Sequence, residues 1–185
     1  MTDSAPKSAD AIRQSGRAAV AHYLGWPIRD VSIQTLRSDE EVRVAGCRLR
    51  LPGLPKETRE DILRSILYNA GALAAEYLFD VETELSASGQ IMDEVYQDAA
   101  QAFPNDRQRQ KALVRTGVDT AFEIVRSYRS GIEALAAALV RLQRVSGPTA
   151  EQLLARGAAG PQGCGATSSP RGQKARSCED TSSPG

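Results

Sequence analysis

The chain has 185 residues, of which 41% are hydrophobic and 25% are charged, and this is enough for one globular domain with a buried core. Its 23 basic and 23 acidic residues balance, which argues against nucleic acid and against an anionic membrane as partners. No apolar run approaches the roughly 20 residues that span a bilayer, and the first residues lack the layout of a signal peptide. We therefore expect a soluble, cytoplasmic protein.

The three cysteines, Cys47, Cys164 and Cys178, are odd in number and form no C-x-x-C pair. Such a pattern favours reduced thiols over a disulfide framework or a zinc ribbon.

Composition divides the chain into three parts. Residues 1–7 are polar and contain Pro6, which predicts a flexible N-terminus. Residues 157–185 are rich in Gly, Ser and Pro and contain no large apolar side chain, so burial cannot offset the entropy lost on ordering, and this segment is predicted to be a disordered tail. The folded domain is therefore predicted to span residues 8–156.

The first part of this domain changes from a helical to an alternating pattern. Apolar and small residues recur at helical spacing over residues 8–24, and Gly25 with Pro27 is a usual helix stop. Residues 28–36, 42–44 and 47–51 alternate between apolar and polar side chains. They predict a small, mostly antiparallel sheet of two or three strands, in which residues 37–41 form a turn.

The remainder is predicted to be helical. Thr58 and Asp61 resemble a capping box that opens a helix ending near Phe79, and its Ala-rich half is expected to pack centrally. A loop at 86–89 leads into a helix ending at Phe103, and another helix covers 107–129. Ser130 and Gly131 are predicted to bend the chain before helices at 132–142 and 146–155. The fold class is α+β, mostly helical, with a small antiparallel sheet and a C-terminal helical bundle.

This order of elements resembles the peptidase domain of the FtsH-type zinc metalloproteases. The first helix and its exit carry the resemblance through Gly16, the apolar run at 18–21, Leu-Gly-Trp-Pro at 24–27 and Val-Ser-Ile at 31–33. Residues 72–79 are similar to the family's G-R-A-A-E-E segment, residues 87–91 to its A-S-N-D-L turn, and residues 121–154 to its C-terminal helices. The resemblance implies a zincin-like fold over residues 8–156.

The residues that would carry the family's chemistry are replaced. In the register set by Gly16, Arg13 and Arg17 stand at the two zinc-binding histidines of H-E-x-x-H, and Gln14 stands at the general base. Gln90 stands at the third ligand, an aspartate. Arginine stays protonated and has no lone pair for a cation, so this resemblance predicts no zinc cofactor, no metal ligand and no catalytic residue here.

Other parts of the family's machinery are also missing. The chain contains no G-x-x-x-x-G-K-[ST] loop, so no ATPase half is expected. His22, the single histidine, lies roughly 140° around the first helix from Arg17 and cannot restore the site. Asp93 and Glu94 follow the Gln90 turn and are better read as a solvated helix face than as a metal site, and Trp26 is expected to pack at the corner between helix and strand.

Two interpretations of the arginine pair follow. In one, Arg13 and Arg17 form ordinary ion pairs with Asp10, Glu76, Asp93 or Glu94. In the other, the former metal cleft remains a pocket in which both guanidinium groups bind a carboxylate, a phosphate or a peptide C-terminus, and peptides add to the edge of the sheet.

The sequence thus predicts a metallopeptidase-like protein without zinc binding or proteolysis, a pseudo-peptidase acting as a peptide-binding, protein-binding or regulatory module. Two alternatives stay open. One is an active zinc metallopeptidase with ligands not yet identified, and the other is an assembly protein whose Ala-rich helices mediate oligomerisation.

Overall fold

The computed structural model describes residues 8–34, 36–37, 42–43, 46–51, 53–54, 56–81 and 85–157. The predicted flexible N-terminus at 1–7, the strand end at Val44 and turn residues 38–41 lie outside the described residues. The predicted tail at 157–185 also lies outside them, except for Gly157, which belongs to the last helix and not to the tail. The elements are α1 (Ala9–Tyr23), β1 (Ile28–Ser32), β2 (Leu36–Arg37), β3 (Val42–Arg43), β4 (Gly46–Leu49), α2 (Arg59–Leu78), α3 (Leu85–Ala102), α4 (Arg107–Ser127), α5 (Arg129–Leu142), β5 (Arg144–Ser146) and α6 (Gly147–Gly157).

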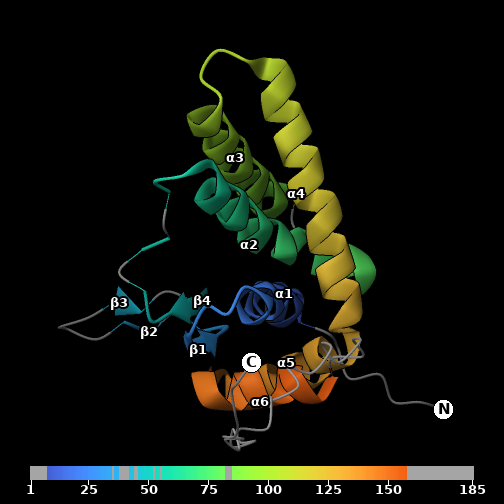
Figure 1. Ribbon diagram of the computed structural model, residues 1–185. Coiled ribbons are helices and arrows are strands. Elements are labelled where there is room, and N and C mark those ends of the chain that lie inside the picture. Colours follow the sequence, from blue (N-terminus) through green and yellow to red (C-terminus); the bar gives the residue numbers. More distant parts are fainter. Residues whose placement is uncertain are drawn as a thin grey trace, which may run out of the picture.

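Helix α1 lies in the middle of the molecule. The helices α2, α3 and α4 lie on one side of it, and α5 and α6 lie on the other (Figure 1). Its alanines at 11, 18, 19 and 21 are fully buried, which is possible because helices on both sides remove it from solvent. Small residues make up much of α1, which lets the neighbouring helices pack closely against it.

The ends of α1 and α2 follow from local sequence. Ser8 accepts a hydrogen bond from the Ala11 amide at the start of α1, and Gly25, at φ +69°, ends this helix in the left-handed conformation that glycine adopts without strain. At α2, Thr58 and Asp61 form the predicted capping box, so this prediction is confirmed.

Helices α1 and α2 cross at two glycines. A Cβ atom on Gly16 would lie 2.3 Å from the carbonyl oxygen of Gly71, and one on Gly71 would lie 2.6 Å from a methyl group of Val20. The crossing therefore requires the absence of a side chain at both positions. The Ala-rich half of α2 packs centrally, as the sequence predicted.

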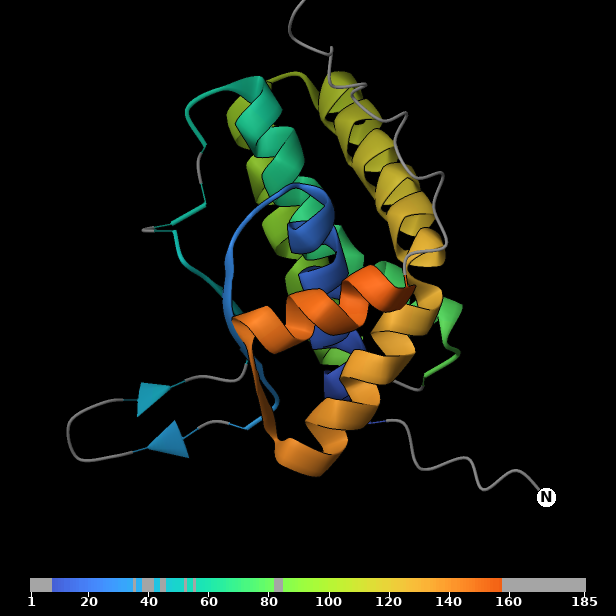
Figure 2. The same cartoon turned by 60° about the horizontal axis from the view of Figure 1, so that its bottom comes forward.

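The sheet differs from its prediction. Strand β1 is central, and β4 and β5 pair with it on either side, both antiparallel. The strands β2 and β3 pair only with each other and lie apart from the helices (Figure 2), so Arg37 belongs to a strand and not to the predicted turn. Strand β5 was not predicted, because three residues between two helices are too short to show an alternating pattern.

A buried carboxylate joins the three strands. Asp30 in β1 is 2% exposed and accepts hydrogen bonds from Arg48 of β4 at 2.7 to 3.0 Å and from Arg144 of β5 at 3.1 Å. Buried carboxylates are stable when such charged donors surround them. The two arginines therefore fix both outer strands to the centre of the sheet.

Two helix boundaries also correct the sequence analysis. Residues 86–89 lie inside α3, which begins at Leu85, and not in the predicted loop; the Ser88 hydroxyl donates a hydrogen bond to Glu76 of α2. The break after α4 falls at Tyr128, and Ser130 and Gly131 lie in the first turn of α5. Gly131 serves packing, since a Cβ atom there would lie 2.9 Å from the Leu154 backbone of α6.

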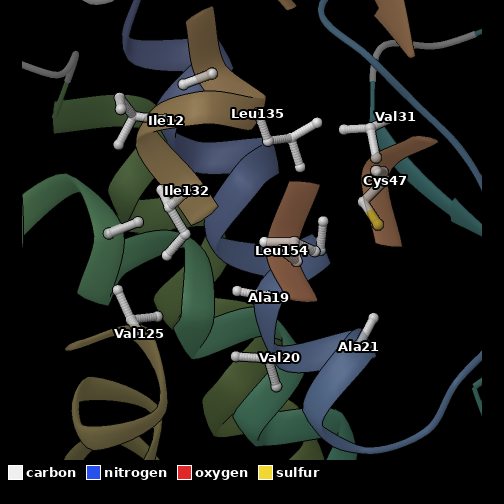
Figure 3. Close-up of a cluster of buried hydrophobic side chains, with 14 of the residues drawn as sticks. Ile12, Ala19, Val20, Ala21, Val31, Cys47, Val125, Ile132, Leu135 and Leu154 are labelled. Carbon is white, nitrogen blue, oxygen red and sulfur yellow. The ribbon is translucent and has the colours of Figure 1, made fainter. Parts of the chain in front are cut away.

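The main core collects side chains from nearly every element. Figure 3 shows residues of α1, α4, α5, α6, β1 and β4 meeting in one cluster. A smaller cluster joins the far ends of α2, α3 and α4. The protein is mostly helical with a small three-stranded antiparallel sheet, which agrees with the predicted α+β class. In the described ranges, no helix combines the length and the apolar character that crossing a membrane requires.

Candidate functional site

The predicted site residues of α1 face α2, α3 and β4. Arg13 and Arg17 are one helical turn apart, so they share a face of the helix. Arg13 contacts Glu76 of α2, and Arg17 lies near Glu94 of α3. Gln14 points toward β4. The sequence analysis named both glutamates among the carboxylates that could pair with these arginines.

The guanidinium group of Arg13 is bonded to acidic side chains. Its Nε atom donates to Oε1 of Glu76 at 2.5 Å, and its Nη1 atom lies 2.7 Å from Asp10. The side chains of Arg13 and Glu76 are only 13% and 6% exposed, and Ser88 donates to the second oxygen of Glu76 at 3.1 Å. A guanidinium so fully engaged has a structural role. The hypothesis that both arginines receive a ligand is not supported at Arg13.

Gln14 occupies a backbone hydrogen-bonding group on the outer edge of the sheet. Its side-chain oxygen accepts a hydrogen bond from the Cys47 amide at 3.1 Å, and the Tyr68 hydroxyl donates to the Cys47 carbonyl at 2.6 Å. Because Cys47 stands opposite Val31 and gives both backbone groups to side chains, these groups lie on the outer edge of β4. An added peptide strand could not bond to β4 at Cys47 while these contacts persist.

Arg17 is the arginine whose bonding is incomplete. Its Nε atom is buried without a hydrogen-bond partner, and its Nη2 atom lies 3.9 Å from Glu94, which is longer than a hydrogen bond. The guanidinium carbon lies 5.9 Å from the centroid of the Tyr68 ring, at the outer limit of a cation–π contact. The side chain of Arg17 is 19% exposed and that of Glu94 is 56% exposed.

An apolar hollow of about 200 Å³ lies beside this arginine. Tyr68 forms one wall of it, and the centroid of its ring lies 5.9 Å from the guanidinium carbon of Arg17, so the cation and the hollow share this residue as a neighbour. Its other walls come from the end of β4 and the segment that follows. The lining residues are Cys47, Leu49, Leu51, Gly53, Leu54 and Tyr68.

A larger hollow of about 600 Å³ lies at the other end of α2, between Tyr77 and Ser88. Among the described residues, the carboxylates that line it are Glu76, which is already paired with Arg13, and Asp80. The size of this hollow would favour it as a binding site, but Arg17 is not among the residues that line it. The smaller hollow is therefore the better candidate, because a cation with an unsatisfied donor lies next to it.

The two reactive groups at the smaller hollow stay protonated at neutral pH. Burial raises the pKa of the Cys47 thiol to about 12, although the Tyr68 hydroxyl and the charge of Arg17 act in the opposite direction. Burial also raises the pKa of Tyr68 well above its ordinary value. Neither group is an activated nucleophile, since the thiolate is the reactive form of cysteine.

The other predicted positions lie outside this arrangement. Gln90 is exposed on α3, whereas Glu94 of the same helix lies near Arg17 and Ser88 donates to Glu76, the partner of Arg13. His22 is half-buried, with its ring edge-on to Tyr128 at 5.7 Å. Trp26 is buried against Tyr68, as expected for a packing residue. Asp93 is exposed.

The donor set does not fit the zinc that the resemblance implies. Arg13, Gln14 and Arg17 offer two cations and one amide oxygen where zinc would need imidazole or carboxylate ligands. Elsewhere in the part of the chain that the structure describes, no three His, Cys, Asp or Glu side chains gather closely enough to hold a metal ion.

Sequence reasoning missed Tyr68 and the place of Cys47. A signal existed in the four-residue spacing of Tyr68, Ala72 and Glu76, which puts the three on one face of α2. The sequence contained no comparable signal for Cys47, because its neighbours are decided by how β4 meets α1 and α2.

Comparison with known proteins adds no family assignment: no protein-family model matches this chain, and a search of curated proteins returned no match.

Proposed function

We propose that this chain is a non-catalytic binding module for peptides or proteins, with the scaffold of an FtsH-type peptidase domain and without its zinc chemistry. The observation that carries the proposal is Arg17, a largely buried cation whose Nε lacks an acceptor and which lies beside an apolar hollow. An unsatisfied buried donor next to apolar surface favours an incoming ligand that supplies the acceptor.

The residues around Arg17 support binding over catalysis. A peptidase needs a general base or an activated nucleophile within reach of the scissile bond. Here the general-base position holds Gln14, whose oxygen is engaged by the Cys47 amide, and Cys47 itself is held in the protonated form. Neither side chain can act as a general base or as an activated nucleophile.

The test combines three measurements on the purified chain. We expect no stoichiometric zinc by elemental analysis, no cleavage of a quenched fluorescent peptide library with or without added zinc, and saturable binding of a degenerate labelled peptide library by fluorescence anisotropy. Stoichiometric zinc with chelator-sensitive cleavage would replace the proposal with an active metallopeptidase. A defined oligomer in light scattering, together with no peptide binding, would replace it with an assembly protein.

A further inference from the structure

Of the two arginines that the sequence suggested as ligand-binding residues, Arg17 is the one with incomplete hydrogen bonding. Arg13 has short contacts to Glu76 and Asp10, whereas the acidic partner of Arg17 within the described ranges is Glu94, at 3.9 Å. The Nε and Nη2 atoms of an arginine lie on one side of the guanidinium, and this side accepts a carboxylate through two parallel hydrogen bonds. On that side of Arg17, Nε is buried without a hydrogen bond, and the nearest described carboxylate, that of Glu94, lies 3.9 Å from Nη2, so a ligand reaches this edge where Glu94 moves aside.

The adjoining hollow has the size and the lining for one apolar side chain. At about 200 Å³ it is smaller than the roughly 300–1,000 Å³ of typical small-molecule sites. Three leucines, Leu49, Leu51 and Leu54, contribute to its walls. It therefore suits a single anchoring residue of a longer ligand.

We propose that this site binds the free C-terminal carboxylate of a peptide whose last residue is apolar, with the carboxylate at Arg17 and the last side chain in the hollow. This inference rests on the proposed function and specifies its ligand. A C-terminal residue is the part of a peptide that carries an anion and a side chain on the same carbon atom. Charge complementarity with Arg17 and the apolar walls beside it select that end of the chain.

Glu94 is the internal competitor for this carboxylate. It lies nearest to Nη2 of Arg17, and at 56% exposure it can turn into solvent when a ligand arrives. Removing its charge while keeping its shape, by Glu94→Gln, should therefore strengthen binding. Removing the cation by Arg17→Gln should weaken it, and Arg17→Lys should restore only part of the affinity because lysine lacks the planar fork.

The probe is a fluorescein-labelled hexapeptide library with Leu, Val or Phe as the last residue, made once with a free C-terminus and once as the C-terminal amide. By fluorescence anisotropy we expect the amide to bind wild-type protein about 10- to 100-fold more weakly, the range for losing hydrogen bonds to a charged group. Arg17→Gln should lower the affinity for the free acid by a similar factor, and Glu94→Gln should raise it several-fold. Arg115→Gln, at an arginine that is 84% exposed on α4, is the matched control and should leave affinity unchanged.

The outcomes separate this inference from the proposed function. Equal binding of acid and amide would overturn the carboxylate site while leaving a peptide-binding module in place. Absence of binding by both libraries would overturn the two proposals together. The comparison of acid with amide uses wild-type protein, so it decides the question even where circular dichroism shows that an Arg17 variant is unfolded. Full competition by hexanoate at the peptide's own concentration would show a site for free apolar acids and not for peptides.

Discussion

Arg13 and Arg17 are the same residue type, one turn apart on one face of α1, yet their surroundings differ. Arg13 meets Glu76, a buried carboxylate of α2 that Ser88 also holds in place. Arg17 meets Glu94, an exposed carboxylate of α3 that stays 3.9 Å away. The position of the acidic partner, more than the arginine itself, decides whether a cation is part of the framework or available to a ligand.

The reason for the difference is the distance of each partner helix. Helices α1 and α2 cross closely at Gly16 and Gly71, which brings Glu76 within hydrogen-bond distance of Arg13. Helix α3 packs chiefly against α2 and α4, so its carboxylate reaches α1 only from the surface. The same charge therefore has a structural role at one end of the helix and remains incompletely bonded one turn later.

The largest expected effect is at Glu76. Glu76→Gln leaves the exposed Asp10 as the charged partner of the buried Arg13 among the residues that the structure describes, and breaking a buried ion pair costs about 3–5 kcal/mol. We expect a loss of unfolding free energy near the lower end of that range in urea denaturation, because Asp10 remains. Glu94→Gln is the control with the same chemical change and should cost less than about 0.5 kcal/mol. Equal losses in the two variants would contradict the contrast between the two arginines.

A second prediction concerns the helix crossing. The new methyl group of Gly16→Ala would meet the Gly71 carbonyl, a backbone atom that cannot turn aside, so we expect a loss of about 3 kcal/mol in unfolding free energy. Gly89→Ala in α3 has open space around the new methyl group and should be neutral, or stabilising by up to about 1 kcal/mol. Thermal denaturation of the wild type and both variants gives the change in unfolding free energy for each substitution. Tolerance of Gly16→Ala would mean that α1 and α2 do not approach as closely as described.

A third prediction addresses Gln14 and Gln90, the two glutamines that the resemblance singled out. Gln14→Ala removes the acceptor of the buried Cys47 amide, and an unsatisfied buried donor costs about 1–3 kcal/mol. Gln90→Ala changes an exposed side chain and should stay within about 0.5 kcal/mol of wild type. Hydrogen exchange should also show faster exchange of the Cys47 amide in the Gln14 variant. Unchanged protection of that amide would argue against the Gln14 contact.

The last prediction concerns alkaline pH, and no effect is expected at neutral pH. The pKa of Cys47 is raised from 9.0 to about 12, so between these values the folded chain keeps a proton that the unfolded chain has released. The unfolding free energy should therefore be unaffected below about pH 9 and should fall as the pH rises toward 12, by at most about 1.4 kcal/mol per pH unit for one group. Cys47→Ala should flatten this dependence, although Tyr68 contributes to it in the same direction.

Thiol labelling checks the same group independently. With Cys164 and Cys178 replaced by serine, Cys47 should react with a disulfide reagent at pH 8 only as fast as the protein opens. Immediate labelling of the native protein would show that the thiol is accessible. It would then contradict the burial of Cys47 beneath its contact with Gln14.

Much of the framework was readable from the sequence. Helical spacing, the Thr58 capping box and Gly25 located α1 and α2, because these signals act through local hydrogen bonds and backbone conformation. The list of carboxylates near Arg13 and Arg17 contained the right partners. The break at Tyr128 and strand β5 were missed, since both depend on what packs against them.

The sequence by itself determined that Arg13, Gln14 and Arg17 offer two cations and one amide, because the identity of a residue fixes the chemistry of its side chain. Only the tertiary structure decided that Arg13 is closed by a buried glutamate, that Gln14 binds the edge of β4, and that Arg17 keeps an unsatisfied donor beside an apolar hollow. These differences come from the distances between helices that are far apart in the chain, and the spacing of residues along a single helix does not contain them.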